Sequence, residues 1–406
     1  MPEPDPSPPS PAATRPQHYP IGTHPATPSL GDLLRERIER TGPLRFPDFM
    51  AAALYEPEYG YYARGTRQIG RGGDFFTSVS VGPVFGEVLA RRFLREWRQS
   101  GCPSRWRIIE CGAHDGRLAA DVLGTLPTLD VRAFAALDYV IAEPLPAHQA
   151  AQRETLRHFH GCVRFVRDAM ELATDPLPGL AFGNELLDAL PFHIVERHHG
   201  QWLERLVTLA PDGGLTWKTG EILDPLLLAA LAPLGKNFTD GYRTEVRTCF
   251  HALLDALARG LESGLMLWVD YGFARPDYYH PDRTSGTLRT FAGHRAGENP
   301  LEHPGETDIT AHVDFTAVAE AALALGGRPT EFRSQGSWLT ATARAWLLEQ
   351  EGNPQPSFLR QFQTLTHPAH LGSRFHILEL SWNPETIPHD PASLAHSLGG
   401  PAAATP

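Results

Sequence analysis

The chain has 406 residues, of which 42% are hydrophobic, and it is therefore long and apolar enough to bury the core of a sizeable fold. Its 47 acidic residues exceed its 36 basic residues by 11, with no block of basic residues, so nucleic acid is not expected as a partner. The four cysteines form no CxxC pair, which favours a reducing compartment without disulfides.

The longest apolar runs, near 226–234 and 265–269, fall well short of the roughly 20 residues that cross a bilayer, so no membrane anchor is expected. Residues 1–28 are rich in Pro, Ser and Ala and lack the pattern of a signal or transit peptide. We therefore expect disordered tails at 1–28 and 391–406 and a cytoplasmic location.

Beyond the first tail, residues 29–100 are interpreted as an N-terminal cap region that ends in a helix over 84–97. From residue 106 onward, short apolar runs alternate with helical patterns, which is typical of βαβ units and a parallel sheet. Strands are expected at 106–111, 139–141, 163–166, 180–183, 264–270, 330–334 and 375–382, and helices at 118–126, 147–159, 246–261, 314–325 and 337–349. The pattern predicts a Rossmann-like α/β core over 101–390.

Two insertions are expected within this core, at about 192–240 and 272–312. In the first, residues 193–218 show alternating apolar and polar positions with an Asp-Gly-Gly turn at 212–214, which predicts a small antiparallel sheet. Such an insertion is a natural place for contacts with a partner.

A glycine-rich turn follows the first core strand, which carries Glu110 near its end. The turn contains Gly112 and Gly116 and leads into a helix, so its backbone N–H groups can approach a ligand, although glycine also serves simply to turn the chain. The spacing is not the G-x-G-x-x-G that the pyrophosphate of NAD requires. An uncharged turn next to Glu110 suits a sulfonium amino acid better.

Acidic residues follow the next two predicted strands. Glu143 ends the second strand, where a carboxylate can accept hydrogen bonds from both hydroxyls of a ribose. Asp168 follows the third strand, where it can accept from the amine of adenine or cap the next helix. Together with the glycine turn, Glu143 predicts a ligand that contains adenosine.

Several segments resemble the MidA-like family of class I S-adenosylmethionine-dependent methyltransferases, which includes the mitochondrial complex I assembly-factor protein arginine methyltransferase. The matching segments are Gly73-Asp-Phe-Phe-Thr-Ser, Phe85-Gly-Glu, residues 110–116, residues 183–191, Asp270-Tyr-Gly, residues 279–288 and residues 308–315. Their shared order runs from about residue 30 to residue 380. The resemblance implies a seven-stranded methyltransferase sheet.

The resemblance implies that S-adenosyl-L-methionine is the cofactor and that Gly112, Gly116 and Glu143 bind it. From their positions on and after the strands, Glu110 and Asp168 are also expected to bind the cofactor. The loop 73–78, which contains Gly73, Asp74 and Thr77, is expected to fold over the cofactor. The resemblance also implies a protein arginine as the methyl acceptor, on a complex I subunit in the mitochondrial member.

The sequence departs from the family at two places. His114 stands where the family has the middle glycine of the turn, and its side chain predicts weaker cofactor binding unless the imidazole points away. Residues 79–82 replace a stretch that contains Pro-Glu.

If the acceptor is a guanidinium, with a pKa above about 12, carboxylates must orient it and stabilise its charge. Asn184 and Glu185 follow the fourth strand at the edge of the sheet where such folds bind ligands, and Asp188 comes shortly after. We expect Glu185 to contact the guanidinium, with Glu245 or Asp270 completing an acidic pair. The alternative is that these residues cap helices and turns.

The 19 histidines include no HExxH motif or other ligand-like spacing, so no metal is expected. Tyr55, Tyr59, Tyr61 and Tyr62 could wall a substrate channel, although packing of the cap is the commoner role of such residues. Two other functions remain open: an assembly chaperone that keeps the fold without turnover, and a methyltransferase for small molecules.

Overall fold

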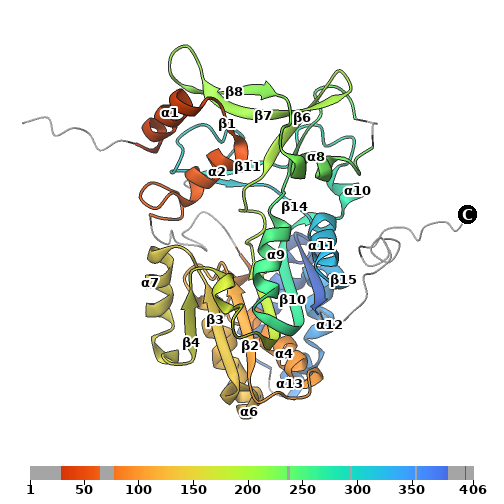
Figure 1. The fold of residues 1–406 in the computed structure, drawn as a ribbon. Coiled ribbons are helices and arrows are strands. Elements are labelled where there is room, and N and C mark those ends of the chain that lie inside the picture. Colours follow the sequence, from red (N-terminus) through yellow and green to blue (C-terminus); the bar gives the residue numbers. More distant parts are fainter. Residues whose placement is uncertain are drawn as a thin grey trace, which may run out of the picture.

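The computed structural model describes residues 29–64, 77–235, 238–292, 295–352, 354–382 and 398. The two predicted tails, 1–28 and 391–406, lie outside the described residues apart from Leu398. Figure 1 shows two lobes, one above the other. We call the lower one, built on the largest sheet, the core lobe and the upper one the small lobe.

The core lobe is built on a mostly parallel sheet. Its strands follow the order β15 (Gly327–Ser334), β16 (Phe375–Trp382), β10 (Leu261–Phe273), β5 (Leu177–Asn184), β2 (Trp106–Cys111), β3 (Leu137–Ala142) and β4 (Val163–Val166). Within this order β16 is antiparallel to both neighbours, and the other pairs are parallel. The predicted α/β class is confirmed. The sheet has one strand more than expected, because the two-residue strand β14 (Val313–Asp314) also pairs with the end of β10.

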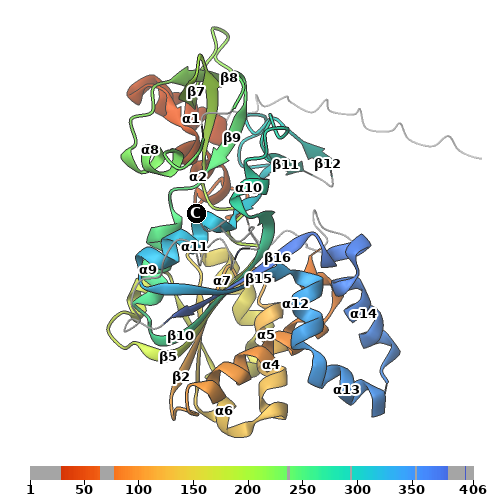
Figure 2. The same ribbon diagram turned by 90° about the vertical axis from the view of Figure 1, so that its right-hand side faces the viewer.

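Helices cover both faces of this sheet (Figure 2). One face carries α4 (Val84–Gln99), α5 (Arg117–Leu129), α12 (Gln335–Thr342), α13 (Arg344–Gly352) and α14 (Pro356–Thr366), and the other carries α9 (Phe250–Ala258) and α11 (Phe315–Ala324). The apolar stripe of α4 explains its place: Phe93 is fully buried, with its ring 4.9 Å from that of Phe182 on β5. The helix predicted at 84–97 is confirmed, and it packs on the core sheet.

Other predicted helices are shorter than expected. The segment 147–159 forms α7 (Pro146–Thr155) and a 3-10 turn (Arg157–Phe159), and the segment 337–349 is divided between α12 and α13. The segment 246–261 begins only at Phe250, because the residues before it form strand β9 (Arg243–Val246). Short helical segments at α3 (Ser78–Val81), α6 (Val131–Ala135), α10 (Arg275–Tyr278), Ala169–Leu172 and Pro368–Gly372 connect the longer elements.

The small lobe contains an antiparallel sheet. Its strands are β1 (Leu44–Arg45), β7 (Gln201–Leu209), β6 (His193–His198), β9 and β8 (Leu215–Gly220), and β7 pairs with β1, β6 and β8. The antiparallel structure predicted over 193–218 is therefore confirmed. Helices α1 (Leu30–Thr41), α2 (Phe46–Tyr55) and α8 (Pro225–Leu231) pack on this sheet, and β11 (Arg289–Ala292), β12 (Arg295–Gly297) and β13 (Asp308–Thr310) form another beside it.

The small lobe is therefore assembled from three distant stretches of the chain, which share one hydrophobic core. Phe46 and Phe49 from α2 are fully buried there together with Phe192 at the start of the first insertion and Ile309 from β13. No helix of the described residues is long and apolar enough to span a bilayer.

Candidate functional site

A cavity of about 810 Å³ lies at the carboxyl ends of the core strands. Gly112 follows β2, Glu143 follows β3, Asp168 follows β4 and Asn184 ends β5, and all four line the cavity. Because β5, β2, β3 and β4 are neighbours in this order, these residues meet at one edge of the sheet, where open α/β folds bind ligands. The volume falls in the range of about 300–1,000 Å³ that is typical of small-molecule sites.

The glycine turn shapes one wall of the cavity. Gly112 has a φ of +68°, a conformation that favours glycine, and a Cβ on it would lie 3.0 Å from Leu186 Cδ1, so a side chain here would also require Leu186 to shift. Gly116, with a φ of +84°, does not line the cavity. A Cβ there would lie 3.3 Å from Gln152 Cα, which indicates that Gly116 lets the start of α5 pack closely against α7.

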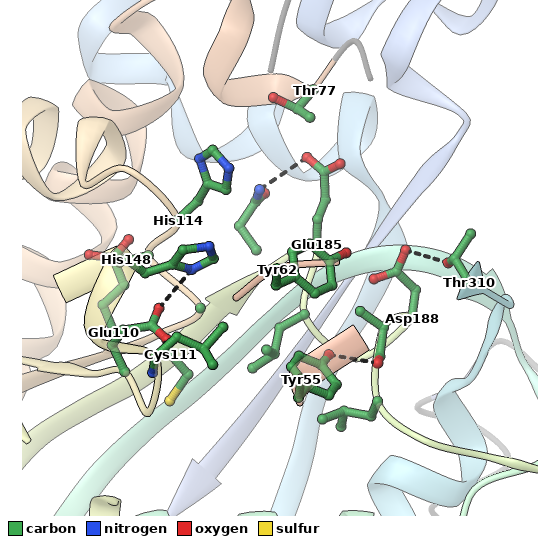
Figure 3. A pocket seen from close by; sticks show the side chains of 18 of the residues that line it. Tyr55, Tyr62, Thr77, Glu110, Cys111, His114, His148, Glu185, Asp188 and Thr310 are labelled. Atoms are coloured by element: carbon green, nitrogen blue, oxygen red, sulfur yellow. Dashed lines mark hydrogen bonds and ion pairs between the residues drawn. The ribbon is translucent and has the colours of Figure 1, made fainter. Parts of the chain in front are cut away.

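His114, in the same turn, has a φ of +47° and lines the cavity. Its ring lies 5.5 Å from that of His148 on α7, edge to face, and Figure 3 shows the two rings next to each other. The imidazole of His114 therefore packs against a neighbour at the cavity wall.

Glu110 and Thr77 also line the cavity. Glu110 is 2% exposed and accepts a hydrogen bond of 2.7 Å from the Tyr139 hydroxyl, and burial raises the pKa of its carboxyl to about 7. Thr77 caps α3 by accepting a hydrogen bond from the Ser80 backbone N–H. The other two predicted residues of this loop, Gly73 and Asp74, lie outside the described residues.

Glu143 is buried at the end of β3 and is held by three neighbours. Its Oε1 accepts from the Leu145 backbone N–H at 2.9 Å, and its Oε2 accepts from Gln152 Nε2 at 3.1 Å. The same Oε2 lies 3.3 Å from His148 Nδ1. Asp168, in contrast, uses its Oδ1 to accept from the Met170 N–H and so caps the 3-10 turn that follows β4.

Carboxyl groups gather at the other end of the cavity, after β5 (Figure 3). Glu185 has a φ of +54°, a strained conformation for this residue type, and strain of this kind concentrates at functional sites. Asn184 Nδ2 donates to Glu185 Oε1 at 3.1 Å. Burial raises the pKa of the Glu185 carboxyl to about 8, and the nearby charge of Asp188 adds to this shift.

Asp188 lies three residues further along the same loop. Its Oδ2 accepts from the hydroxyl of Thr310 on β13 at 2.8 Å, which joins the loop to the small lobe (Figure 3). Burial raises the pKa of its carboxyl. Among the described residues, Arg247 donates to the backbone carbonyls of Asp188 and Ala311, and no ion pair joins its guanidinium to the carboxyl group of Asp188 or Glu185. Both carboxyl groups are therefore available to an added cation.

Two tyrosines from the small lobe close this part of the cavity. The rings of Tyr55 and Tyr62 are stacked, with centroids 5.6 Å apart and planes 22° apart. The Tyr55 hydroxyl donates to the Ala189 carbonyl at 2.8 Å, and the Tyr62 hydroxyl donates to Asp308 Oδ1 at 2.9 Å. Both tyrosines line the cavity, which gives the acidic end an aromatic wall.

Two predicted catalytic residues lie outside the cavity, and those predictions are corrected. Glu245 belongs to strand β9 instead of opening a helix, and its carboxylate accepts from the backbone N–H groups of Thr287 and Leu288. Asp270 is fully buried near the end of β10, where its Oδ2 accepts from backbone N–H groups of the loop after β5, including that of Leu187 at 2.7 Å. Both carboxylates are saturated by backbone donors, so they hold loops in place.

Sequence reasoning missed several residues of this site. His148 contacts Glu143 from α7, and Thr310 and Asp308 reach the acidic end from β13. A signal existed for His148, because Gln152 follows it by four residues and the two therefore share one face of a helix. For Thr310 no spacing could show the contact, since 122 positions separate it from Asp188.

Some buried polar atoms at the cavity lack a hydrogen-bond partner, among them His148 Nε2 and Asn184 Oδ1. Buried polar groups are normally satisfied, so these atoms are free to form hydrogen bonds with a ligand or with water. No cluster of three or more His, Cys, Asp or Glu side chains that could hold a metal is present among the described residues.

Comparison with known proteins identifies a matching family over residues 88–332, described as "Putative S-adenosyl-L-methionine-dependent methyltransferase". Among solved structures, a protein from Burkholderia thailandensis crystallised with S-adenosyl-homocysteine is similar, with 30% identity and a TM-score of 0.77 over 87% of this chain and 91% of that one. A native structure from the same organism has 28% identity and a TM-score of 0.76 over 88% and 93% of the two chains.

Curated relatives carry a more specific name. The Drosophila melanogaster "Protein arginine methyltransferase NDUFAF7 homolog, mitochondrial" is 30% identical over 87% of this chain and 84% of its own length. The Rattus norvegicus protein arginine methyltransferase NDUFAF7 is 29% identical over 94% and 89%.

These relatives are named as mitochondrial proteins, and this finding contradicts the cytoplasmic location predicted from the sequence. That prediction rested on the composition of residues 1–28, which does not determine the compartment.

Proposed function

The chain belongs to the family of S-adenosyl-L-methionine-dependent methyltransferases, and we propose that it methylates an arginine side chain of a protein. The family match and the relative crystallised with S-adenosyl-homocysteine confirm the resemblance found in the sequence. They also support the cofactor and the enzyme class. The acceptor is our proposal, and the names of the curated relatives support it.

The residues of the cavity fit the cofactor. Gly112 leaves the first position of the turn after β2 without a side chain, and Glu143 offers a carboxylate at the end of β3. The unpartnered His148 Nε2 adds an acceptor next to it. We propose that Gly112, Glu143, Glu110 and Asp168 line the cofactor, with Thr77 across the cavity.

One observation carries the proposed acceptor: the half-buried Glu185 and Asp188 lie at the cavity with no cationic side chain paired to their carboxyl groups in the described structure. Unpaired buried carboxylates are costly, and a bound guanidinium would offset that cost with charge-assisted hydrogen bonds in a planar fork. The stacked rings of Tyr55 and Tyr62 form a flat wall beside them, and a planar guanidinium packs on an aromatic face better than an ammonium does.

The reaction needs orientation more than a strong base. The cofactor supplies an electrophilic methyl group on a sulfonium; the carbon–sulfur bond breaks as the carbon–nitrogen bond forms, and the guanidinium nitrogen loses a proton. Glu185 and Asp188 hold the guanidinium in line, which is the main contribution expected of the enzyme. The positive charge of a bound guanidinium favours the ionised form of the Glu185 carboxyl, and this carboxylate can accept the proton that the guanidinium nitrogen releases.

The small lobe completes the acceptor side of the cavity. Thr310 fixes Asp188 by its hydrogen bond of 2.8 Å, and Asn184 fixes Glu185 by one of 3.1 Å. We propose these residues as positioning groups. On the resemblance found in the sequence, we extend the proposal to a subunit of respiratory complex I as the acceptor protein.

The test is methyl transfer from tritium-labelled S-adenosyl-L-methionine to a cell extract, separated afterwards into protein and small-molecule fractions. The proposal predicts label in protein. Label confined to small molecules would favour a small-molecule methyltransferase, and no label with intact cofactor binding would favour an assembly chaperone.

A further inference from the structure

We propose that His148 binds a ribose hydroxyl of the methyl donor, so that a histidine and a carboxylate share the ribose diol. This role concerns the cofactor and is independent of the acceptor proposed above. It was not expected from the sequence, which pointed to Glu143 alone.

The position of His148 is the first support. The residue lies on α7, is 6% exposed and lines the cavity. Its Nδ1 faces Glu143 Oε2 at 3.3 Å, and in Figure 3 a dashed line marks this contact while the other ring nitrogen points away from it. The imidazole is therefore wedged between the carboxylate and the cavity.

Neighbouring rings fix the direction in which the imidazole points. The ring of His114 meets it edge to face with centroids 5.5 Å apart, and that of Tyr62 does so at 6.2 Å. These contacts come from the glycine turn of the core lobe and from the small lobe. The orientation of His148 is thus set before a ligand binds.

The hydrogen-bond partner of Nδ1 determines which nitrogen of the neutral imidazole carries the proton. An ionised carboxylate only accepts hydrogen bonds, so the ring carries its proton on Nδ1 and donates it to Glu143. The lone pair on Nε2 is then an acceptor. Nε2 is buried with no partner in the described structure, which is unfavourable unless a ligand donates to it.

The number of hydrogen bonds that the Glu143 carboxylate can still accept indicates which group of the ligand donates to His148 Nε2. A carboxylate accepts about four hydrogen bonds. Leu145 N–H, Gln152 Nε2 and His148 Nδ1 already use three of these positions. Glu143 can therefore accept from about one further donor, whereas a ribose diol offers two. The second hydroxyl finds its acceptor at His148 Nε2, directly beside this carboxylate.

The test is calorimetric titration of the full chain with S-adenosyl-homocysteine and with its 2′-deoxy and 3′-deoxy analogues, without any methyl acceptor. For the parent, removal of the hydroxyl that donates to His148 is expected to weaken binding about tenfold, as for one lost buried hydrogen bond. His148→Phe keeps the ring and removes both nitrogens. This variant is expected to bind S-adenosyl-homocysteine about tenfold more weakly than the parent does. It should bind the analogue that lacks the hydroxyl that donates to His148 as tightly as it binds S-adenosyl-homocysteine itself.

Two further variants separate this role from packing. His148→Gln retains an acceptor at a similar position, so removal of the same hydroxyl should again weaken binding, although by less than in the parent. This variant replaces His148→Phe in the test if His148→Phe unfolds at a much lower temperature than the parent. His158→Phe makes the same change at an exposed histidine after α7 and should match the parent. The proposal would be overturned if each deoxy analogue lost as much affinity relative to S-adenosyl-homocysteine in His148→Phe as it does in the parent. A failed search for methylarginine would leave these titrations unchanged.

Discussion

The carboxylate of Asp270 accepts a hydrogen bond from the backbone N–H of Asp188 at 3.2 Å. The same oxygen accepts from the N–H groups of Leu186 and Leu187, so one buried side chain holds the whole turn that carries the proposed guanidinium site. Asp270 itself does not line the cavity. Its contribution to the site is therefore to keep Asp188 in place.

This relationship predicts that Asp270→Ala is strongly destabilising. The substitution leaves several buried N–H groups without an acceptor, and we expect a loss of about 3 kcal/mol in the free energy of unfolding, measured by urea denaturation. Asp270→Asn keeps one oxygen and should lose less. Asp282→Ala, at a side chain that is 92% exposed, is the control and should change little. A loss in Asp270→Ala no larger than in this control would refute the structural role.

Glu185→Gln is expected to abolish most methyl transfer and to spare cofactor binding. The amide is nearly the same size but cannot offer a negative charge to a guanidinium, so transfer should fall about 100-fold or more, as for a lost charge-assisted hydrogen bond. The affinity for S-adenosyl-homocysteine should change less than about twofold, because Glu185 lies at the acidic end of the cavity. Glu154→Gln, at a side chain 76% exposed, is the matched control.

The raised pKa of Glu185 predicts how stability varies with pH. The carboxyl has a pKa of about 8 in the folded protein against an ordinary value of 4.5, so the folded chain holds this proton more tightly than the unfolded chain. The resulting stabilisation is fully present below pH 4.5 and is lost as the pH rises through 8. The free energy of unfolding should therefore fall more steeply with pH in the parent than in Glu185→Gln. Parallel profiles for the two proteins would contradict this prediction.

Thr310→Val tests whether the small lobe positions the acceptor. The variant removes the hydroxyl that donates to Asp188 and keeps the volume of the side chain. We expect kcat/KM for the acceptor protein to fall about five- to tenfold, with the affinity for S-adenosyl-homocysteine unchanged. Thr310→Ser retains the donor and should remain close to the parent. A loss of the same size in both variants would point to packing instead.

The core sheet was predictable because a local pattern encodes it. Buried parallel strands give short apolar runs, and ligand-binding residues follow them directly, which is why the positions of Gly112, Glu143 and Asn184 could be anticipated. The direction of each side chain was not encoded in the same way. Asp270 lies near the end of β10 and Glu143 directly follows β3, yet the Asp270 carboxylate points into a backbone turn.

The small lobe was harder to predict, because it is assembled from segments far apart in the chain. Glu245 was misinterpreted as the start of a helix, since the apolar stripe of α9 continues into Val246 of the preceding strand. The contact between Tyr62 and Asp308 joins residues 246 positions apart, and no periodicity records such a pair. The site between the lobes therefore emerges only from the folded chain.

Arginine is the proposed methyl acceptor, and amino-acid analysis of the labelled protein product identifies the methylated residue. We expect methylarginine in the hydrolysate of protein labelled by the parent, at least about 100-fold less with Glu185→Gln, and an unchanged amount with Glu154→Gln. Label in lysine or another residue instead, or equal amounts of methylarginine from the parent and Glu185→Gln, would contradict it.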